Sequence, residues 1–296
     1  AGGGRRGMGV AWDADMLAEV FRTTQATAAT LFGDARVYAE RYLPRARHVE
    51  VQILADQHGN VVHLGERDCT MQRRHQKLIE ESPAPALPED LVARIHTAAV
   101  TGARAAGYQG AGTFEFLVEC ADDTDEFYFM EVNCRIQVEH PVTEMVTGID
   151  LLTEQIRIAA GEPLRLRQRD VVLNGAAIEC RINAEDPHHG FAPAPGTITG
   201  LSLPAGPFVR VDTHACPGCL IAPEYDSMIA KIISWAPDRD TAIARMRRAL
   251  SETSVRGDGM HTTAGFLDDL IDSPEFRTAA HTTSHVDALT ERQAAR

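Results

Sequence analysis

The stretch "GTFEFLVECADDTDEFYFMEVN", residues 112–133, contains two aromatic-rich runs separated by an acidic segment. The runs, residues 112–119 and 126–133, are rich in the residue types that favour β-strands. The segment between them, residues 120–125, is short and polar, which favours a turn. The stretch therefore predicts a β-hairpin.

Two glutamates face each other in this predicted hairpin. If it closes symmetrically about Asp123, Glu115 and Glu131 are direct cross-strand partners. Strand periodicity places three further side chains on the same face: Leu117, Phe129 and Asn133. Like charges directly opposite each other destabilise a sheet. Two carboxylates with an amide oxygen suit Mg²⁺ or Mn²⁺, which would remove that penalty. The alternative is two exposed glutamates on a solvated face, but the neighbouring phenylalanines indicate burial.

The segment after the hairpin, "CRIQVEHPVTE", carries charged and amide side chains at every second position. An extended chain would point Arg135, Gln137 and Glu139 the same way. A guanidinium binds a planar carboxylate-like anion through two hydrogen bonds, and a carboxylate beside it can act as a general base. A surface ion pair between Arg135 and Glu139 is the alternative.

Three other segments suggest anion binding. Residues 67–77, "RDCTMQRRHQK", gather side chains that suit phosphate: Arg73, Arg74, His75 and Lys77. Residues 2–8, "GGGRRGM", could cover phosphates with backbone N–H groups, or form a flexible tail. Arg181 in "ECRINAED" could be a buried catalytic cation or a structural one.

Cys216 and Cys219 form the motif "CPGC" close to His214. A closed zinc site needs four ligands, and no second pair lies nearby in the sequence. The motif is therefore interpreted as a Pro-Gly turn.

Periodicity and breaker residues predict the remaining elements. Helices are expected at 15–31, 88–106, from Asp150 to Gly161, and at 239–251. Strands are expected at 36–43, 48–56, 61–68, near 207–212 and near 227–235. Residues 165–170 are interpreted as a linker into a second, strand-rich unit covered by one or two helices.

Composition narrows the function classes. A formal net charge of −13 over 296 residues argues against nucleic acid or an anionic membrane surface as the main partner. No apolar run is long enough to span a membrane. Six scattered cysteines without a secretory signal indicate reduced thiols and a cytoplasmic location. The chain starts inside what resembles a glycine loop, so a fragment of a longer protein is expected.

A series of motifs resembles, in order, the biotin carboxylases, the ATP-grasp components of acyl-CoA and pyruvate carboxylases. The motifs are "YAERYL", "RHVEVQILAD", "ERDCTMQRRHQKLIEESPAP", "GAGTFEFL", "MEVNCRIQVEHPVTEMVTGIDL", "ECRINAEDP" and "YDSMIAKI". The resemblance implies an α+β fold, the C-terminal part of an ATP-grasp domain followed by a biotin carboxylase C-terminal domain. The implied divisions are the end of a lid subdomain (1–42), a core half (43–165), the C-terminal domain (170–285) and a tail (286–296).

The resemblance also implies residue roles. The metal ligands would be Glu115, Glu131 and Asn133. ATP would contact Gly4, Arg5, Glu40, Arg41, Tyr42, Leu43, His48, Gln72, His75 and Leu117, together with the two metal-binding glutamates. Bicarbonate would contact Lys77, Arg135, Gln137, Val138 and Arg181. Arg135 and Arg181 would act in catalysis, Glu139 would be the base, and Arg181 would also bind biotin.

The implied activity is the carboxylation of biotin on a carrier, driven by ATP and bicarbonate through carboxyphosphate. ATP, Mg²⁺ or Mn²⁺, and biotin would be the cofactors. A biotin carboxyl carrier, a carboxyltransferase and a second copy of the chain would be the partners. Two ATP-contacting lysines of the family would lie upstream of residue 1, so the fragment alone is expected to be inactive. The alternatives are another ATP-grasp carboxylate or carbamate ligase, or a catalytically inactive nucleotide-binding fragment.

Overall fold

The chain divides into two compact units, residues 1–44 and 45–296. The computed structural model describes residues 7–120 and 126–294. The predictions for Gly4, Arg5 and the turn around Asp123 lie outside these described residues.

The first unit contains the predicted helix, α1 (Ala14–Phe32). It begins where the Asp13 side chain accepts a hydrogen bond from the Met16 backbone N–H, a typical helix cap. It ends at Gly33, which has a φ of 67° and lets the chain leave the helix in the left-handed region.

The predicted strand at residues 36–43 is wrong, because this segment has no regular structure. The Asp34 carboxylate instead accepts hydrogen bonds from both the backbone N–H and the guanidinium of Arg36. A strand also needs a partner for its backbone groups, and the described part of this unit contains no other strand.

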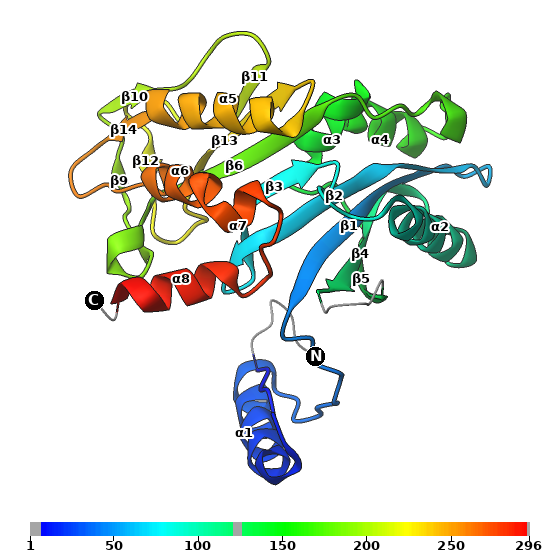
Figure 1. Ribbon diagram of the computed structural model, residues 1–296, viewed down its shortest axis with the longest axis horizontal. Coiled ribbons are helices and arrows are strands. Elements are labelled where there is room, and N and C mark those ends of the chain that lie inside the picture. Colours follow the sequence, from blue (N-terminus) through cyan, green and yellow to red (C-terminus); the bar gives the residue numbers. More distant parts are fainter. Residues whose placement is uncertain (1–6, 121–125, 295–296) are drawn as a thin grey trace. The chain divides into compact units, whose positions relative to one another are not determined.

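Residues 45–296 contain an eight-stranded sheet in the order β11-β13-β6-β3-β2-β1-β4-β5, in which every neighbouring pair is antiparallel (Figure 1). Its strands are β1 (Ala46–Ala55), β2 (Val61–Arg73), β3 (Gln76–Ser82), β4 (Gly110–Glu119), β5 (Phe127–Asn133), β6 (Ala176–Asn183), β11 (Val209–Thr213) and β13 (Met228–Ala236). Because β6 pairs with β3, the strands that follow the predicted linker continue the same sheet.

Three short strand pairs lie outside this sheet. They are β7 (Glu185–Asp186) with β8 (Ala192–Pro193), β9 (Gly196–Thr197) with β12 (Leu220–Ile221), and β10 (Gly200–Ser202) with β14 (Ser254–Arg256). Each of these strands is only two or three residues long, which is too short for an alternation of apolar and polar residues to be visible in the sequence.

Both predicted hairpins, β1–β2 and β4–β5, are confirmed. The strand β3 was not predicted, because the basic segment before it suggested a loop. The chain reverses there at Arg74 and His75, which have φ values of 47° and 68°. Two consecutive left-handed residues are typical of the two-residue turn that matches the twist of a hairpin.

The helices of this unit are α2 (Glu89–Ala105), α3 (His140–Thr147), α4 (Leu151–Ala159), α5 (Arg239–Glu252), α6 (Ala264–Asp272), α7 (Pro274–Arg277) and α8 (His285–Ala294). The predictions of α2, α4 and α5 are confirmed. The short helices α3, α6, α7 and α8 were not predicted, and α3 carries a proline in its first turn. No helix in the described ranges has the combined length and apolarity that crossing a bilayer requires.

The two faces of the sheet have different characters. On one face, α2 packs against apolar side chains of β1 and β4 that include Val49, Phe114 and Phe116. On the other face, α3 packs against Ala177 of β6 and Ile233 of β13. Strand alternation puts a row of buried charged side chains on this second face, beneath α3. The buried members of the candidate functional site lie in this row.

Candidate active site

Glu115 and Glu131 are cross-strand partners in the β4–β5 ladder, as predicted. The Asn133 amide nitrogen lies 2.6 Å from Glu115 Oε1 and 3.3 Å from Glu131 Oε1, so the three side chains share one side of the hairpin. A flip of the amide would present its oxygen instead of its nitrogen. The three residues therefore offer the oxygen donors that a hard divalent cation prefers.

The predicted position of Phe129 is wrong. The register shifts by one residue between Glu115 and Phe116, so Phe129 pairs with Phe116 instead of Leu117. Its ring lies 6.4 Å from that of Phe114 and 6.0 Å from that of Phe116, on the α2 face. This β-bulge reverses the side on which the neighbouring β5 side chains project. Leu117 stays on the Glu115 face, because β4 keeps a regular register with β1.

Glu115 is buried among hydrogen-bond donors. His48 Nε2 lies 2.7 Å from its Oε2, and Gln137 Nε2 donates to its Oε1 at 2.6 Å. Burial raises the pKa of Glu115, but the hydrogen bond from His48 and the charge of Lys77 outweigh it and hold the pKa well below its usual range. Glu115 is therefore a permanent anion.

Glu139 lies between two cations. Lys77 Nζ is 2.5 Å from Glu139 Oε1 and 2.6 Å from Glu50 Oε2. Arg181 donates to Glu139 Oε2 at 3.0 Å and to Glu80 Oε1 at 2.6 Å. Burial and the nearby Glu50 raise the pKa of Glu139, and Lys77 and Arg181 lower it further than that, so its carboxylate is ionised. The site thus contains a buried, ionised carboxylate between two cationic side chains.

The elements explain how distant residues meet here. Glu139 is the N-cap residue of α3, and Lys77 is the second residue of β3, just after the turn. Arg181 and Lys231 are cross-strand partners on β6 and β13. Lys231 Nζ donates to the Val138 carbonyl at 2.7 Å, which holds the loop before α3 in place.

The predicted common direction of Arg135, Gln137 and Glu139 is wrong for Arg135. The chain bends and turns over residues 134–139 instead of running extended. Gln137 and Glu139 are buried in the cluster, whereas the Arg135 side chain is exposed and donates to the Ile136 carbonyl. No hydrogen bond or ion pair among the described residues joins Arg135 to the cluster carboxylates.

The other predicted nucleotide contacts belong to different elements and are divided between the two units. Gln72 is buried on β2, and its amide nitrogen has no hydrogen-bond partner within residues 7–120 and 126–294. His75 lies in the exposed β2–β3 turn. Glu40, Arg41, Tyr42 and Leu43 belong to the first unit, where the Tyr42 ring meets Trp12 edge to face at 5.4 Å.

Five further charged residues on this face were not predicted from the sequence: Glu50, Arg67, Glu80, Glu179 and Lys231. All are buried. Arg67 donates to Glu50 at 2.6 Å and to Thr143 of α3 at 2.9 Å, which ties the helix to the sheet. The alternation of polar and apolar residues along β1 predicts a strand, but it does not show which of its polar side chains are buried.

Glu80 and Glu179 form an unusual pair in this row. They are direct cross-strand partners with side chains 0% exposed. Glu80 Oε2 and both oxygens of Glu179 have no hydrogen-bond partner in the described part of the chain. Burial raises the pKa of Glu80 to about 7 and that of Glu179 well above its ordinary value. We therefore expect the pair to hold a proton near neutral pH.

Replacing Glu179 with glutamine tests this protonation. When folding raises the pKa of a carboxyl group, the group contributes its full share of stability below the pKa of the unfolded chain, about 4.3 for glutamate. That contribution is lost as the pH rises through the higher pKa of the folded protein. The contribution of this pair to the free energy of unfolding should therefore fall between pH 5 and pH 8. In Glu179→Gln this fall should shrink by about 1–3 kcal/mol, measured by urea unfolding. The exposed control Glu224→Gln should keep the original slope; an unchanged slope in Glu179→Gln would contradict the assignment.

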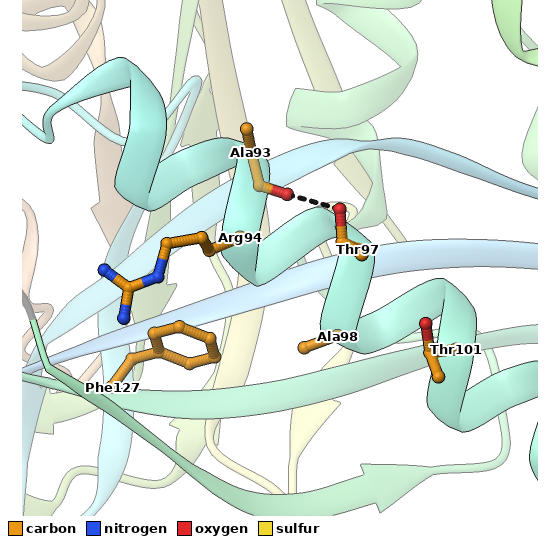
Figure 2. Close-up of a pocket in the computed structure, with 6 residues that line it drawn as sticks. All are labelled: Ala93, Arg94, Thr97, Ala98, Thr101 and Phe127. Carbon is orange, nitrogen blue, oxygen red and sulfur yellow. Dashed lines mark hydrogen bonds between the residues drawn. The ribbon is translucent and has the colours of Figure 1, made fainter.

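A shallow hollow of about 690 Å³ lies elsewhere, on the surface of α2 (Figure 2). It is lined by Ala93, Arg94, Thr97, Ala98, Thr101 and Phe127. The Phe127 ring packs on Phe116, so the hollow is on the α2 face, opposite Glu115. With Arg94 as its one charged lining side chain, it does not contribute to the carboxylate cluster.

Comparison with known proteins assigns this arrangement to a class. Residues 1–167 match the family model of the carbamoyl-phosphate synthase L chain, ATP binding domain, and residues 179–288 match the biotin carboxylase C-terminal domain. The first match identifies an ATP-grasp protein. The two matches in this order define the family more closely: the chain belongs to the biotin carboxylases.

Individual relatives agree with this assignment. The chain is 55% identical over 289 residues to a biotin carboxylase of Nostoc sp., covering 98% of this chain and 64% of the relative. The structure of a Campylobacter jejuni biotin carboxylase with a βγ-ATP ligand has 46% identity and a TM-score of 0.91, over 97% of this chain and 63% of that one.

A second similar structure is the biotin carboxylase domain dimer of Hydrogenobacter thermophilus 2-oxoglutarate carboxylase, in complex with MgADP, ADP and bicarbonate. This chain is 43% identical to it in sequence, with a TM-score of 0.92, and the match covers 99% of this chain and 64% of that one. The chain thus spans about two thirds or less of the length of these relatives. The predicted family and fold are confirmed.

Proposed function

We propose that the protein carrying this chain carboxylates biotin at the expense of ATP and bicarbonate. The observation that carries the proposal is the ion cluster in which Glu139 lies between Lys77 and Arg181. A buried carboxylate flanked by two cations suits a small oxyanion that must be bound and also deprotonated. The nucleotide and bicarbonate named for the Hydrogenobacter relative support the same ligands here.

The residues of the β4–β5 hairpin fit a divalent metal ion. Glu115 and Glu131 would hold Mg²⁺ or Mn²⁺ together with the Asn133 oxygen, and the facing carboxylates would then no longer repel each other. When bound, such an ion would offset the charge of the ATP phosphates. Glu115 is prepared for this role, since its low pKa keeps it ionised.

Bicarbonate would bind between Lys77 and Arg181, with the Gln137 side chain and the Val138 main chain completing the pocket. An anion bound there would accept the hydrogen bonds that Lys77 and Arg181 donate to Glu139 in this structure. The Glu139 carboxylate would then become a stronger base, at the moment when it is needed to remove the bicarbonate proton. Arg135, which is exposed, would close on the anion from outside.

The proton transfer would allow bicarbonate to attack the γ-phosphoryl group of ATP and form carboxyphosphate. Positioning and charge stabilisation are the main contributions that a protein makes to such a transfer. Arg181 would next stabilise the negative charge that develops on biotin when its ureido nitrogen loses a proton. Arg181 is already fixed for this role by Glu80.

Biotin would be supplied on a carrier protein or domain, and a carboxyltransferase would use the carboxybiotin. We also propose that the protein acts as a homodimer in the cytoplasm, by analogy with the dimer named for the Hydrogenobacter relative and in line with the free cysteines. The final acceptor, an acyl-CoA, a 2-oxo acid or urea, would be selected by the carboxyltransferase.

The proposal is tested by ATP hydrolysis in the full-length protein. We expect turnover to require bicarbonate and to increase when free biotin is added. Phosphate release should be measured with each component omitted in turn. Hydrolysis that is indifferent to both bicarbonate and biotin would refute the proposed activity and favour a different ATP-grasp ligase.

A further inference from the structure

The CPGC motif, residues 216–219, is separate from the carboxylate cluster and has no role in the proposed reaction. Its interpretation as a Pro-Gly turn is confirmed: the Cys219 N–H donates to the Cys216 carbonyl at 3.0 Å, and Gly218 has a φ of 94°. This turn brings the two sulfur atoms to 3.2 Å from each other. Both thiols are free.

The backbone around the turn is held from both sides. Gly218 N–H donates to the Ile198 carbonyl at 2.7 Å, and Ile198 N–H donates to the Cys219 carbonyl at 2.9 Å. The next residues continue this pairing as β12 with β9. Ile198 is fully buried, so the anchor belongs to the core. The proximity of the two sulfurs is therefore a property of an ordered backbone.

The two thiols are also accessible and chemically unequal. Cys216 is exposed and Cys219 is partly exposed, whereas Cys69 and Cys180 are buried in the core. The hydrogen bond between the two sulfurs lowers the pKa of Cys219 and raises that of Cys216. In a pair of this spacing, the thiol with the lower pKa is the more reactive nucleophile.

A shared metal ion is not supported at this position. Neither cysteine belongs to a group of three His, Cys, Asp or Glu side chains, within the described ranges, whose atoms are close enough to share an ion. Two thiolates alone leave a tetrahedral site half complete. The remaining chemistry for two adjacent thiols is oxidation to a disulfide.

We propose that Cys216 and Cys219 are a reversible redox site that closes to an intramolecular disulfide. With hydrogen peroxide as oxidant, the Cys219 thiolate attacks one peroxide oxygen and becomes a sulfenic acid, and hydroxide leaves. The Cys216 sulfur then attacks the Cys219 sulfur, and water leaves as the S–S bond forms. Two thiols are oxidised, and one peroxide is reduced to two waters. The sulfurs need to approach from 3.2 Å to only about 2.05 Å. A small-molecule dithiol reverses the step.

The test is a thiol count and peptide map of the 296-residue chain after treatment with a small excess of peroxide. We expect two of its six thiols to be lost, with a disulfide mapped to residues 216–219 and both thiols recovered with dithiothreitol. Cys219→Ser should abolish this loss. Cys216→Ser should leave a sulfenic acid at position 219 that dimedone traps.

The matched control is Cys134→Ser, which removes an exposed cysteine outside the turn and should leave the two-thiol loss unchanged. The proposal is overturned if all six thiols survive in the unmodified chain under conditions that oxidise free glutathione. It is also overturned if the thiols that are lost map to Cys120 or Cys134, or if Cys216 and Cys219 convert to sulfinic acids without passing through a disulfide.

Discussion

Replacing Glu139 by glutamine is expected to lower the turnover of biotin carboxylation by about 100- to 10,000-fold, the range typical of a lost general base. Glutamine keeps the size of the side chain and removes the charge that lies between Lys77 and Arg181. The two cations remain available for bicarbonate, so the KM for bicarbonate should change much less than kcat. The acidic limb of the pH–rate profile should also disappear.

The matched control for this variant is Glu81→Gln. Glu81 is also buried and accepts a hydrogen bond from an arginine, Arg239, at 2.6 Å, but this pair makes no contact with Lys77 or Arg181. Both variants should lose stability, and only Glu139→Gln should lose turnover. Equal losses of turnover in the two variants would mean that Glu139 has a structural role instead of a chemical one.

Replacing Glu131 by glutamine is expected to lower turnover at ordinary Mg²⁺ concentrations by on the order of a hundredfold, because the cation would lose one of two anionic ligands. Glu131 is exposed, and Asn133 is its one hydrogen-bonding partner among the described side chains, so folding should be unaffected. Raising Mg²⁺ or Mn²⁺ should restore part of the activity. Bound Mn²⁺, followed by electron paramagnetic resonance, should show the weakened affinity directly.

The control for this variant is Glu126→Gln, an exposed glutamate just before β5 in the same hairpin. This substitution also removes one negative charge, but at a position that is not predicted to be a metal ligand. The Mn²⁺ affinity of the Glu126→Gln variant should therefore match that of the unmodified protein. If Glu131→Gln binds Mn²⁺ as tightly as this control does, the metal-binding role of the Glu115–Glu131 pair is wrong.

Residue patterns within one hairpin were sufficient to predict the part of the candidate site that lies on β4 and β5. Glu115, Glu131 and Asn133 are close in sequence, so strand periodicity and a turn were sufficient to bring them together. The bulge after Glu115 could not be predicted, because nothing in the sequence of β5 marks a one-residue shift. Among the residues predicted to share the Glu115 face, the bulge affected Phe129, which lies on the opposite face.

Long-range pairing explains what the sequence patterns did not predict. Arg181 reaches Glu139 only because β6 pairs with β3 across about a hundred residues of chain, and this neighbour relation has no local signal. The alternation along β1 and β2 predicted strands and did not indicate that their charged residues are buried. They are buried because Arg67 and Glu50 compensate each other beneath α3. The family resemblance therefore supplied the role of Arg181.

The central claim is that the Lys77–Glu139–Arg181 cluster transfers a carboxyl group from bicarbonate to biotin. The most direct measurement is the incorporation of ¹⁴C-bicarbonate into free biotin by the full-length protein with Mg·ATP. We expect an acid-labile, ATP-dependent labelled carboxybiotin that is lost in Glu139→Gln and kept in Glu81→Gln. Label recovered in another acyl phosphate or carbamate while biotin stays unlabelled would contradict it.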